Sequence, residues 1–348
     1  MKGFKISRLT GHNLPVFRKY IGEVFHQKHI LRDVQYFKWQ YSGFYVASAN
    51  DTIVGHFGFK DLEYKIYDTV RTVRALMNLF VLEPYRSFGV SALLARKVLE
   101  TPHAVFTSGY TEETTKLVAH LRPSWKDRGN FRRFVAIIDG SAPILSRYAN
   151  KKFIAKLQKS TLLYYPKNNL EIRILSGRGS FGTLWRDIRK KYPVTIERTD
   201  AYINWRFARH PMFRYNFLTA QRGNAYRGYL VYKYEKCNGF KIARIVDLIA
   251  IDQAAEESLI YGCMVRARHD SANVIDFLFS GTFYRDVLLR LGFFTVSRRS
   301  CFADFPIFFS PIEYGRMTYI NAAYDFSAPL DNCYFTKADG DRDRPNFR

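Results

Sequence analysis

The sequence predicts an α+β (α/β) fold made of two similar domains in tandem, each a mixed, mostly antiparallel sheet flanked by helices. The length of 348 residues fits about two domains of ~100–200 residues each. A hydrophobic fraction of 47% and a charged fraction of 24% are typical of globular chains, and 17% aromatic residues argue against disorder. Segments of strand-like and helix-like periodicity also follow one another in the same order in both halves.

In the first half, residues 14–29 predict a helix, because apolar side chains recur at helical spacing and Pro15 suits a first turn. Residues 43–60 predict a hairpin that turns at Asn50-Asp51. The remaining elements of this half are a strand over 70–81, a loop over 82–89, a helix over 90–100, a strand over 104–107, a helix over 113–121 and a closing strand over 134–138.

Asp139-Gly140-Ser141 interrupts this pattern, and residues 143–158 predict a connecting helix with Ser141 as its cap. We therefore expect a first domain over residues 1–140 and a connecting helix and linker over residues 141–170. The second domain is expected over residues 171–348 and ends in a C-terminal tail.

The two halves share a short aromatic motif. Tyr36-x-x-Trp39-x-Tyr41 is matched by Tyr202-x-x-Trp205-x-Phe207, 166 positions later. Chance matching in an aromatic-rich chain is the alternative, but the repeated order of elements favours two copies of one α+β unit. After the second motif we expect a hairpin over 217–234, a long strand over 242–251, a helix over 254–268, a strand over 273–279 and a helix over 283–291.

The composition argues against several protein classes. The four cysteines, Cys237, Cys263, Cys301 and Cys333, are widely spaced, which disfavours a disulfide scaffold and the common zinc motifs. No apolar run reaches ~18 residues, and the first residues have no apolar signal core. We expect an intracellular, cytoplasmic protein.

The formal net charge of +23 suggests an anionic partner. Solvated lysines alone are the simplest alternative. The basic residues are spread along the chain without a long basic tail, and no helix-turn-helix, RNA-recognition or finger motif is present, so nucleic acid is disfavoured. A phosphorylated ligand is favoured, and contact with the inner-membrane surface stays open as a second explanation.

Residues 79–94 describe a strand that enters a basic, glycine-containing turn and leaves it as a helix. The first N–H groups of such a helix are unpaired and attract an anion. Gly89 lets a phosphate approach the backbone, Arg86 adds a positive charge, and Ser91 is small and can donate a hydrogen bond. An ordinary strand-to-helix turn is the alternative, but this chemistry suits a pyrophosphate.

The string Val81-x-x-Pro84-Tyr85-Arg86-x-x-Gly89-x-Ser91 resembles the acyl-CoA loop of the GNAT acetyltransferase superfamily. The motif of that family is Arg or Gln, then any two residues, then Gly, then any one residue, then Gly or Ala. Arg86 and Gly89 match this motif, whereas Ser91 stands where the family has Gly or Ala. The resemblance covers about residues 1–140 and implies acetyl-CoA as the cofactor, held by its pyrophosphate on the loop. The implied cofactor-binding residues are Leu79, Val81, Arg86, Ser87, Phe88, Gly89, Val90 and Ser91.

The second half resembles a GNAT unit by layout only. After its long strand, Asp252 and Gln253 lead to Glu256 and Glu257, with no basic-x-x-Gly, and acidic residues there disfavour an anion. We expect this degenerate domain to bind the acceptor. The Tyr-x-Asn-Trp-Arg-Phe string and the C-terminal tail are similar to GNAT proteins of bacterial surface-polysaccharide clusters, which implies an amino sugar as the acceptor.

The resemblance implies direct attack of an amine on the thioester, and no cysteine or serine lies in a nucleophile motif. Backbone N–H groups near residues 78–81 would polarise the thioester carbonyl. Tyr110 is our candidate for protonating the leaving thiolate, with a packing role as the alternative. Asn78 interrupts an apolar strand and is a candidate for binding the acceptor or pantetheine, unless it only satisfies a core hydrogen bond.

The remaining candidates lie in the second half. Asp247 interrupts an apolar strand and either pairs with Arg206 or Arg244 or binds the acceptor amine. Arg206 and His210 could face an anionic group of the acceptor, and Trp205 could stack on a sugar ring or serve as a core anchor. Asp341 and Asp343 belong to a solvated terminus or to a segment that folds back to deprotonate the amine; the tail lacks a complete calcium-loop pattern, so no metal site is expected.

The sequence therefore predicts an acetyl-CoA-dependent N-acyltransferase whose anionic, amine-bearing acceptor is a nucleotide- or lipid-linked amino sugar. An aminoacyl-tRNA-dependent transferase of the same tandem fold would also explain the charge. A non-enzymatic binding protein with a decayed GNAT fold is the third possibility.

Overall fold

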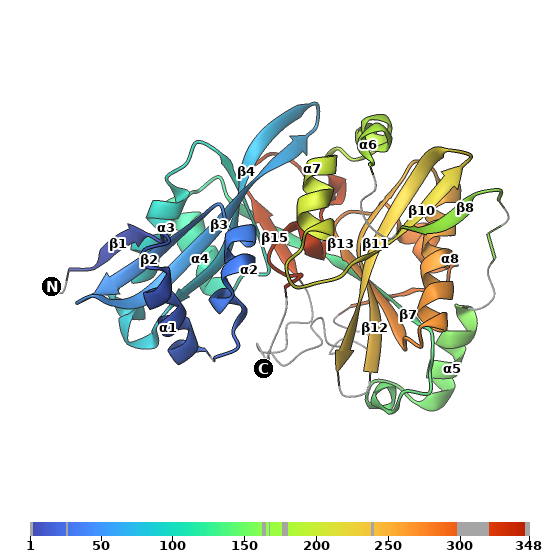
Figure 1. The fold of residues 1–348 in the computed structure, drawn as a ribbon, viewed down its shortest axis with the longest axis horizontal. Helices are drawn as coiled ribbons and strands as arrows, with labels where there is room; N and C mark the ends of the chain where they lie inside the picture. Colours follow the sequence, from blue (N-terminus) through green and yellow to red (C-terminus); the bar gives the residue numbers. More distant parts are fainter. Residues whose placement is uncertain are drawn as a thin grey trace. The chain divides into compact units, whose positions relative to one another are not determined.

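The structure of the chain is a computed structural model that describes residues 3–25, 27–161, 165–166, 168–175, 180–237, 240–297 and 320–344 (Figure 1). The chain divides into two units. The first unit takes residues up to Asn130 together with 320–330 and the tail from Asp339. The second takes residues from Phe131 together with 331–338. The C-terminal segment therefore contributes to both units, whereas we expected it in the second alone.

The sheet of the first unit has the strand order β1-β2-β3-β4-β5-β15-β6. All neighbours in it are antiparallel except β4 and β5, which are parallel. The strands are β1 (Lys5–Arg8), β2 (Gly43–Ala49), β3 (Thr52–Ile66), β4 (Thr69–Val81), β5 (Ala104–Ser108), β15 (Asn321–Tyr324) and β6 (Lys126–Asn130).

Helices cover both faces of this sheet, with α1 and α2 in front of it and α3 and α4 behind it in Figure 1. The apolar stripe of α3, which includes Val90, Leu94 and Val98, is completely buried against β2, β3 and β4. The helix expected over 14–29 ends at Val24. The helical elements are α1 (Leu14–Val24), η1 (Ile30–Arg32), α2 (Val34–Gln40), η2 (Glu83–Phe88), α3 (Val90–Leu99) and α4 (Glu112–Leu121).

The sheet of the second unit has the order β8-β10-β11-β12-β13-β7-β14, and its single parallel pair is β12 with β13. Helix α8 lies along one face of this sheet. The strands are β7 (Arg132–Ile137), β8 (Glu171–Leu175), β10 (Asn216–Arg222), β11 (Ala225–Cys237), β12 (Phe240–Ala250), β13 (Val274–Phe279) and β14 (Phe294–Val296); β9 (Val194–Ile196) pairs with β16 (Cys333–Tyr334).

The helical elements of the second unit include the connecting helix, which begins later than expected. Asn150, not Ser141, caps α5, because its side chain accepts a hydrogen bond from the Phe153 N–H at 2.9 Å. The elements are η3 (Pro143–Arg147), α5 (Lys151–Ser160), α6 (Gly182–Ile188), η4 (Arg189–Lys191), α7 (Asp200–Ile203), η5 (Asn204–Ala208), α8 (Gln253–His269) and α9 (Arg285–Arg290). Two short helical turns, η6 (Leu330–Asn332) and η7 (Lys337–Asp339), follow near the C-terminus.

The two sheets have matching strand orders, which confirms the predicted fold class of two mostly antiparallel mixed sheets flanked by helices. The strand expected to close the first unit, however, is β7 of the second sheet, where Ile137 pairs with Val274 of β13. In the first sheet the corresponding place, between β5 and β6, is taken by the C-terminal strand β15. Hydrophobic periodicity could not predict this exchange, because it indicates where a strand lies in the sequence but not which strand it pairs with.

The two tryptophans of the repeated motif lie on comparable elements. Trp39 is in α2, directly before the β2–β3 hairpin, and Trp205 is in the π-helical segment η5, before the β10–β11 hairpin. Each is half-buried and packs against the tyrosine three residues earlier.

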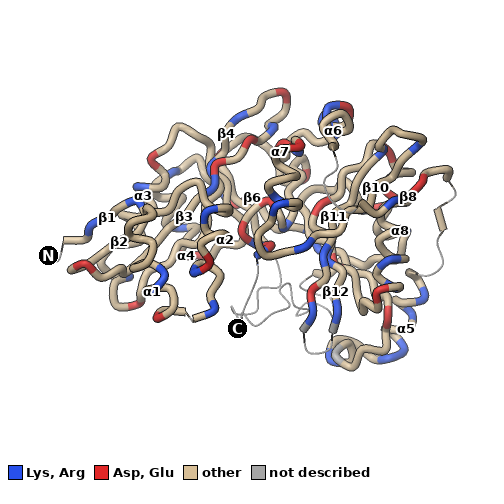
Figure 2. The backbone as a smooth tube through the Cα atoms, in the orientation of Figure 1, with Lys and Arg blue, Asp and Glu red and all other residues tan. Residues whose placement is uncertain are grey.

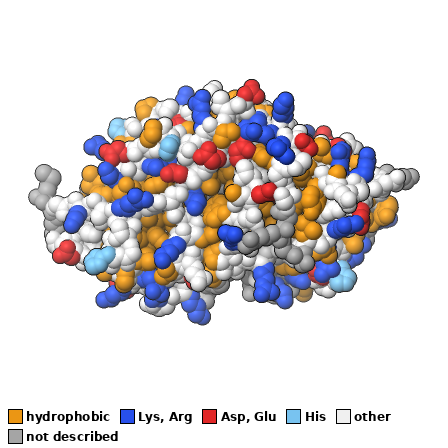
Figure 3. Space-filling view, turned by 45° about the horizontal axis from the view of Figure 1, so that its top comes forward, with side chains coloured by type: hydrophobic (Ala, Val, Ile, Leu, Met, Phe, Trp, Pro, Cys, Tyr) orange, Lys and Arg blue, Asp and Glu red, His pale blue; other side chains and the backbone are white. Residues whose placement is uncertain are grey.

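Basic residues are distributed along both units (Figure 2), and their side chains do not gather in one patch on the face shown in Figure 3. Among the described residues, no helix is both long and apolar enough to span a membrane.

Candidate functional site

The first sheet opens between its two parallel strands. Their paired register runs from Val73 and Ala104 to Ala75 and Phe106, whereas β4 continues to Val81. Beyond this point β4 contains a bulge, since its residues Asn78 and Leu79 oppose the single Phe57 of β3, and Asn78 has a φ of +56°. The bulge turns β4 away from β5 and leaves one edge of its last residues unpaired with that strand.

Backbone donors face this opening. The N–H of Leu82 donates to the Val54 carbonyl of β3 at 2.9 Å. Because successive N–H groups of a strand point to opposite sides, the N–H groups of Val81 and Leu79 point away from β3, toward the open side. Both residues are among those that the resemblance implied for cofactor binding, and they lie in the segment whose N–H groups we expected to polarise the thioester.

The loop after β4 forms an open helix N-terminus. The short helix η2 leads to Gly89, whose φ of +73° is left-handed, and α3 begins at Val90 without a side-chain cap. A Cβ at Gly89 would meet nothing within 4 Å, so an anion can approach the backbone there. The Arg86 Nε donates to the Val81 carbonyl at 3.0 Å, which holds its guanidinium beside the opening. Ser87 and Phe88 are exposed next to it, and Ser91 is half-buried.

The C-terminal tail lies across the diverging strand ends. The Arg342 Nε donates to the Ser108 carbonyl at the end of β5, at 3.1 Å. Arg344 donates to the Asn78 Oδ1 of β4 at 2.6 Å and lies 3.4 Å from the Asp341 carboxylate. The structure thus brings together Asn78 and Asp341, which are far apart in the sequence.

Both tail carboxylates are buried rather than solvated. Asp341 is 5% exposed and Asp343 2% exposed. A buried carboxylate is costly unless its charge is compensated, and Asp341 has Arg342 and Arg344 within 3.5 Å. The tail is therefore an ordered part of the first unit.

Two residues at this place were not predicted from the sequence. The Tyr41 hydroxyl accepts a hydrogen bond from the Asn78 amide, and Arg344 bonds the other side of the same amide. Burial raises the pKa of Tyr41 well above its usual range, and the nearby Tyr36 and Asp341 add to that effect. Tyr41 is thus a neutral phenol. Its signal in the sequence was the last aromatic position of the repeated motif, to which we had assigned no role.

Tyr110 follows Gly109 at the end of β5. Its N–H donates to the Asn321 Oδ1 at 3.0 Å, so β15 fixes the backbone here. The ring is 8% exposed and packs edge-on against Trp125, with ring centroids 5.3 Å apart. Tyr110 is therefore held in the core, at the edge of the opening.

In the second unit, Asp247 is completely buried and pairs with Arg198 at 3.2 Å, an arginine that was not predicted from the sequence as its partner. The hydroxyls of Tyr229 and Tyr334 also donate to it, at 3.0 and 3.2 Å. Arg198 follows β9, and nothing in the sequence predicted that this segment lies beside Asp247 of β12.

The other acceptor candidates of the second unit form contacts within that unit. The Arg206 Nε donates to the Ala338 carbonyl at 2.6 Å, and Arg206 is 1% exposed. The His210 Nδ1 accepts hydrogen bonds from the N–H groups of Met212 and Phe213, so its ring closes a turn. Trp205 is half-buried and keeps some exposed surface.

The start of α8 differs from the start of α3. Asp252 caps α8, because its Oδ1 accepts a hydrogen bond from the Ala255 N–H at 2.9 Å. Arg227 pairs with the same carboxylate at 2.5 Å. The Asp252 carboxylate therefore already occupies the helix N-terminus where an external anion would bind. Within the described ranges, no group of three or more His, Cys, Asp or Glu side chains could hold a metal ion.

The acetyltransferase (GNAT) family model matches residues 14–129, the part of the chain that contains the opening, the loop and α3. No curated protein matches the chain. Among solved structures, the chain is similar to a GCN5-related N-acetyltransferase from Anabaena variabilis, with 12% identity and a TM-score of 0.58 over 79% of this chain and 66% of that one. The chain thus spans slightly less than two thirds of that protein.

Two further structures match over more of the chain. One is a conserved protein of unknown function from Enterococcus faecalis, a candidate N-acyltransferase, with 9% identity and a TM-score of 0.61 over 92% of this chain and 72% of that one. The other is the Saccharomyces cerevisiae N-myristoyltransferase with bound myristoyl-CoA, with 9% identity and a TM-score of 0.57 over 95% and 84%. At these identities the likeness concerns the fold. Residues 14–129 thus match the acetyltransferase (GNAT) family model, and the chain as a whole shares its fold with these solved structures.

Proposed function

We propose that the protein transfers an acetyl group from acetyl-CoA to an amine, with the cofactor in the first unit. The observation that supports this most is the divergence of β4 from β5 beside the uncapped start of α3. The pyrophosphate would lie on the backbone of residues 87–91, with Arg86 supplying positive charge. The pantetheine arm would lie along the open edge of β4 and accept hydrogen bonds from the N–H groups of Leu79 and Val81.

The chemistry is a direct exchange of a C–S bond for a C–N bond. The amine nitrogen attacks the thioester carbonyl carbon, and the backbone N–H groups at the bulge stabilise the oxyanion that develops. The C–S bond then breaks, CoA leaves as a thiolate, and the amine gives up one proton. We assign that proton to Asp341 or Asp343, and the proton that the thiolate gains to Tyr110.

Asn78 and its neighbours would position the reacting amine. The Asn78 amide is held on one side by Tyr41 and on the other by Arg344, which also lies beside Asp341. This connected set gives the amide and the carboxylate a defined geometry at the point where β4 turns outward. Preorganised polar groups at a reacting centre contribute to rate because they need not reorganise during the reaction.

The acceptor we propose is an amino sugar carried on a nucleotide or lipid-linked phosphate, recognised by the second unit. The net charge of +23 favours an anionic carrier. Arg206 and His210 are our candidates for its phosphate and Trp205 for the sugar ring, whereas Asp247, completely buried and paired with Arg198, has a structural role. Trp205 is the one of these three candidates with exposed surface, which makes it the first to test.

Thermal unfolding with acetyl-CoA tests the cofactor site. At about 100 times its dissociation constant, acetyl-CoA should stabilise the protein by about 2.7 kcal/mol. Arg86→Glu should remove this shift, while Arg71→Glu, at an exposed position of β4, should keep it. An equal shift in both variants contradicts the cofactor assignment. Myristoyl-CoA, the ligand of the yeast neighbour, should be compared directly to determine the acyl chain.

Release of free CoA thiol with amino-sugar acceptors tests the reaction. Acetylation of a nucleotide-linked amino sugar supports the proposal. If no amino sugar reacts while aminoacyl-tRNA does, the acceptor class is wrong, and the aminoacyl-transferase alternative, which the net charge also favours, replaces it.

A further inference from the structure

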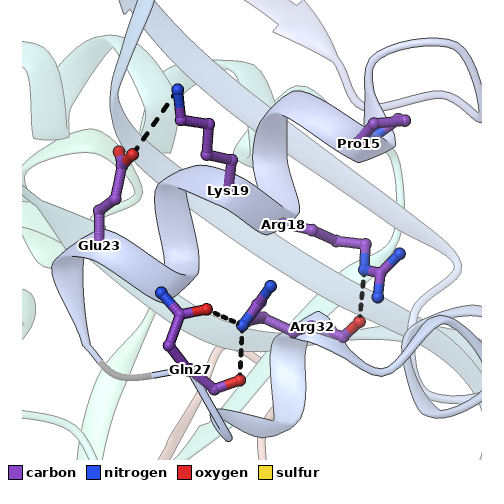
Figure 4. Close-up of a pocket in the computed structure, with 6 residues that line it drawn as sticks. All are labelled: Pro15, Arg18, Lys19, Glu23, Gln27 and Arg32. Atoms are coloured by element: carbon purple, nitrogen blue, oxygen red, sulfur yellow. Dashed lines mark hydrogen bonds and ion pairs between the residues drawn. The ribbon is translucent and has the colours of Figure 1, made fainter.

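A cavity of about 400 Å³ lies on the first unit, away from the residues assigned to acyl-CoA. Helix α1 provides one side of it, and η1 with the preceding segment provides the other (Figure 4). The lining residues are Pro15, Arg18, Lys19, Glu23, Gln27 and Arg32. Three of the six are basic and one is acidic, so the lining carries a formal charge of +2.

This charge is not neutralised within the cavity. Lys19 and Glu23 lie 3.9 Å apart with side chains that are 79% and 61% exposed, and such a solvated pair contributes little. Among the residues that the structure describes, no carboxylate lies within ion-pair distance of Arg18 or Arg32. Both guanidinium groups therefore keep a full positive charge and free donors for a ligand.

The two arginines are held in place by the backbone around them. The Arg18 Nε donates to the Arg32 carbonyl at 2.8 Å, and the Arg32 Nη1 donates to the Gln27 carbonyl at 2.6 Å. A Cβ at Gly22 would lie 3.0 Å from the Gln27 amide and 3.2 Å from the Arg32 Cζ, so the glycine lets both side chains rest against α1. The cavity is thus partly preorganised.

One donor in the cavity has no acceptor. The Arg32 Nε is buried and makes no hydrogen bond within the described part of the chain. Leaving such a donor unsatisfied is unfavourable, so the protein gains from a movement of the Arg32 side chain that lets an acceptor oxygen reach its Nε.

We propose that this cavity binds the phosphate group of a small phosphoester. Guanidinium groups match the geometry of phosphate oxygens, and a phosphate dianion balances the formal charge of +2. In this assignment Arg32 and Arg18 donate to the phosphate oxygens and the flexible Lys19 adds a third positive charge. The site goes beyond the proposed acetyl transfer and does not depend on it.

Titration calorimetry with inorganic phosphate and with uridine diphosphate, on the full chain at low salt, tests the site. Arg32→Gln should weaken binding at least ~10-fold, since it removes charge-assisted hydrogen bonds. Gly22→Ala should weaken it without any change of charge, because the new methyl group displaces Gln27 and the Arg32 side chain that is bonded to it. Arg71→Gln, which removes an exposed arginine elsewhere on the same unit, should leave the affinity unchanged.

Vesicles of phosphatidylcholine with phosphatidic acid distinguish a lipid headgroup from a soluble phosphoester; binding to either, lost in Arg32→Gln, supports the site. If Arg32→Gln fails to fold, Lys19→Gln changes only an exposed side chain and should weaken binding several-fold. The proposal would be overturned if none of phosphate, uridine diphosphate and the vesicles binds. It would also be overturned if Arg71→Gln weakens phosphate binding as much as Arg32→Gln does, or if CoA displaces the bound phosphate.

Discussion

The two units show how one scaffold can hold an open anion site or close it. In the first unit, residues 82–89 separate β4 from α3, and α3 starts at an exposed glycine. In the second, only residues 251 and 252 separate β12 from α8, and Asp252 caps the helix with its own carboxylate. A helix N-terminus attracts an anion from outside only where the chain does not supply one.

The strands before these helices differ in the same way. β12 also continues past its pairing with β13, which ends at Ile245 and Phe277. There, however, the Leu248 N–H donates to the Tyr334 hydroxyl at 3.0 Å, and the Leu248 carbonyl accepts from Tyr284 at 2.6 Å. Tyrosines thus satisfy the backbone that the first unit leaves open for a ligand. We therefore expect ligand binding at the first opening and a structural role for the second.

The largest expected effect is on turnover. Asp341→Asn or Asp343→Asn, whichever removes the true base, should lower acetyl transfer by ~10²–10⁴-fold while acetyl-CoA affinity stays unchanged. Asp51→Asn, in the exposed β2–β3 turn, is the matched control. Steady-state rates and calorimetric affinities measure the two quantities separately. Full activity in both tail variants would show that the base lies elsewhere.

The second unit should respond in stability. Asp247→Asn leaves Arg198 buried without its ion pair, which should lower the free energy of unfolding by about 3–5 kcal/mol. Urea denaturation measures this loss. Acetyl-CoA should bind the folded variant with the affinity of the unmodified protein; a marked loss of that affinity would mean that the second unit shares in cofactor binding.

Charge at the first loop gives the next effect. Arg86→Glu should remove the stabilisation of about 2.7 kcal/mol that saturating acetyl-CoA provides. The equivalent test in the second unit is Gln253→Lys, which places a cation beside α8 and should create no second cofactor site, since Asp252 still occupies the helix start. A second equivalent of bound acetyl-CoA in Gln253→Lys would contradict the comparison.

The smallest effect concerns the α8 cap. Asp252→Ala should cost about 0.5–2 kcal/mol of stability, as lost helix caps do. The heat of acetyl-CoA binding should not change. Chemical denaturation with and without the cofactor provides both values, and an unchanged stability would mean that the Asp252 hydrogen bond to Ala255 contributes nothing measurable.

The sequence was informative where a local pattern encodes the chemistry. The succession of hairpin, strand, loop and helix over residues 43–100, and the spacing of Arg86 and Gly89, predicted the fold class and the open helix start. What it missed depends on contacts between distant segments. Nothing local showed that β7 and β15 exchange places, that Arg198 would meet Asp247, or that Arg344 would reach Asn78. These depend on tertiary pairing, on which periodicity carries no information.

The most direct test of the comparison is a crystal structure of the full chain with acetyl-CoA. We expect one bound cofactor, with its pyrophosphate on the first turn of α3 beside Arg86 and its pantetheine along the Leu79–Val81 edge of β4. Pyrophosphate density at the start of α8 instead, or a cofactor that contacts neither Gly89 nor Arg86, would contradict it.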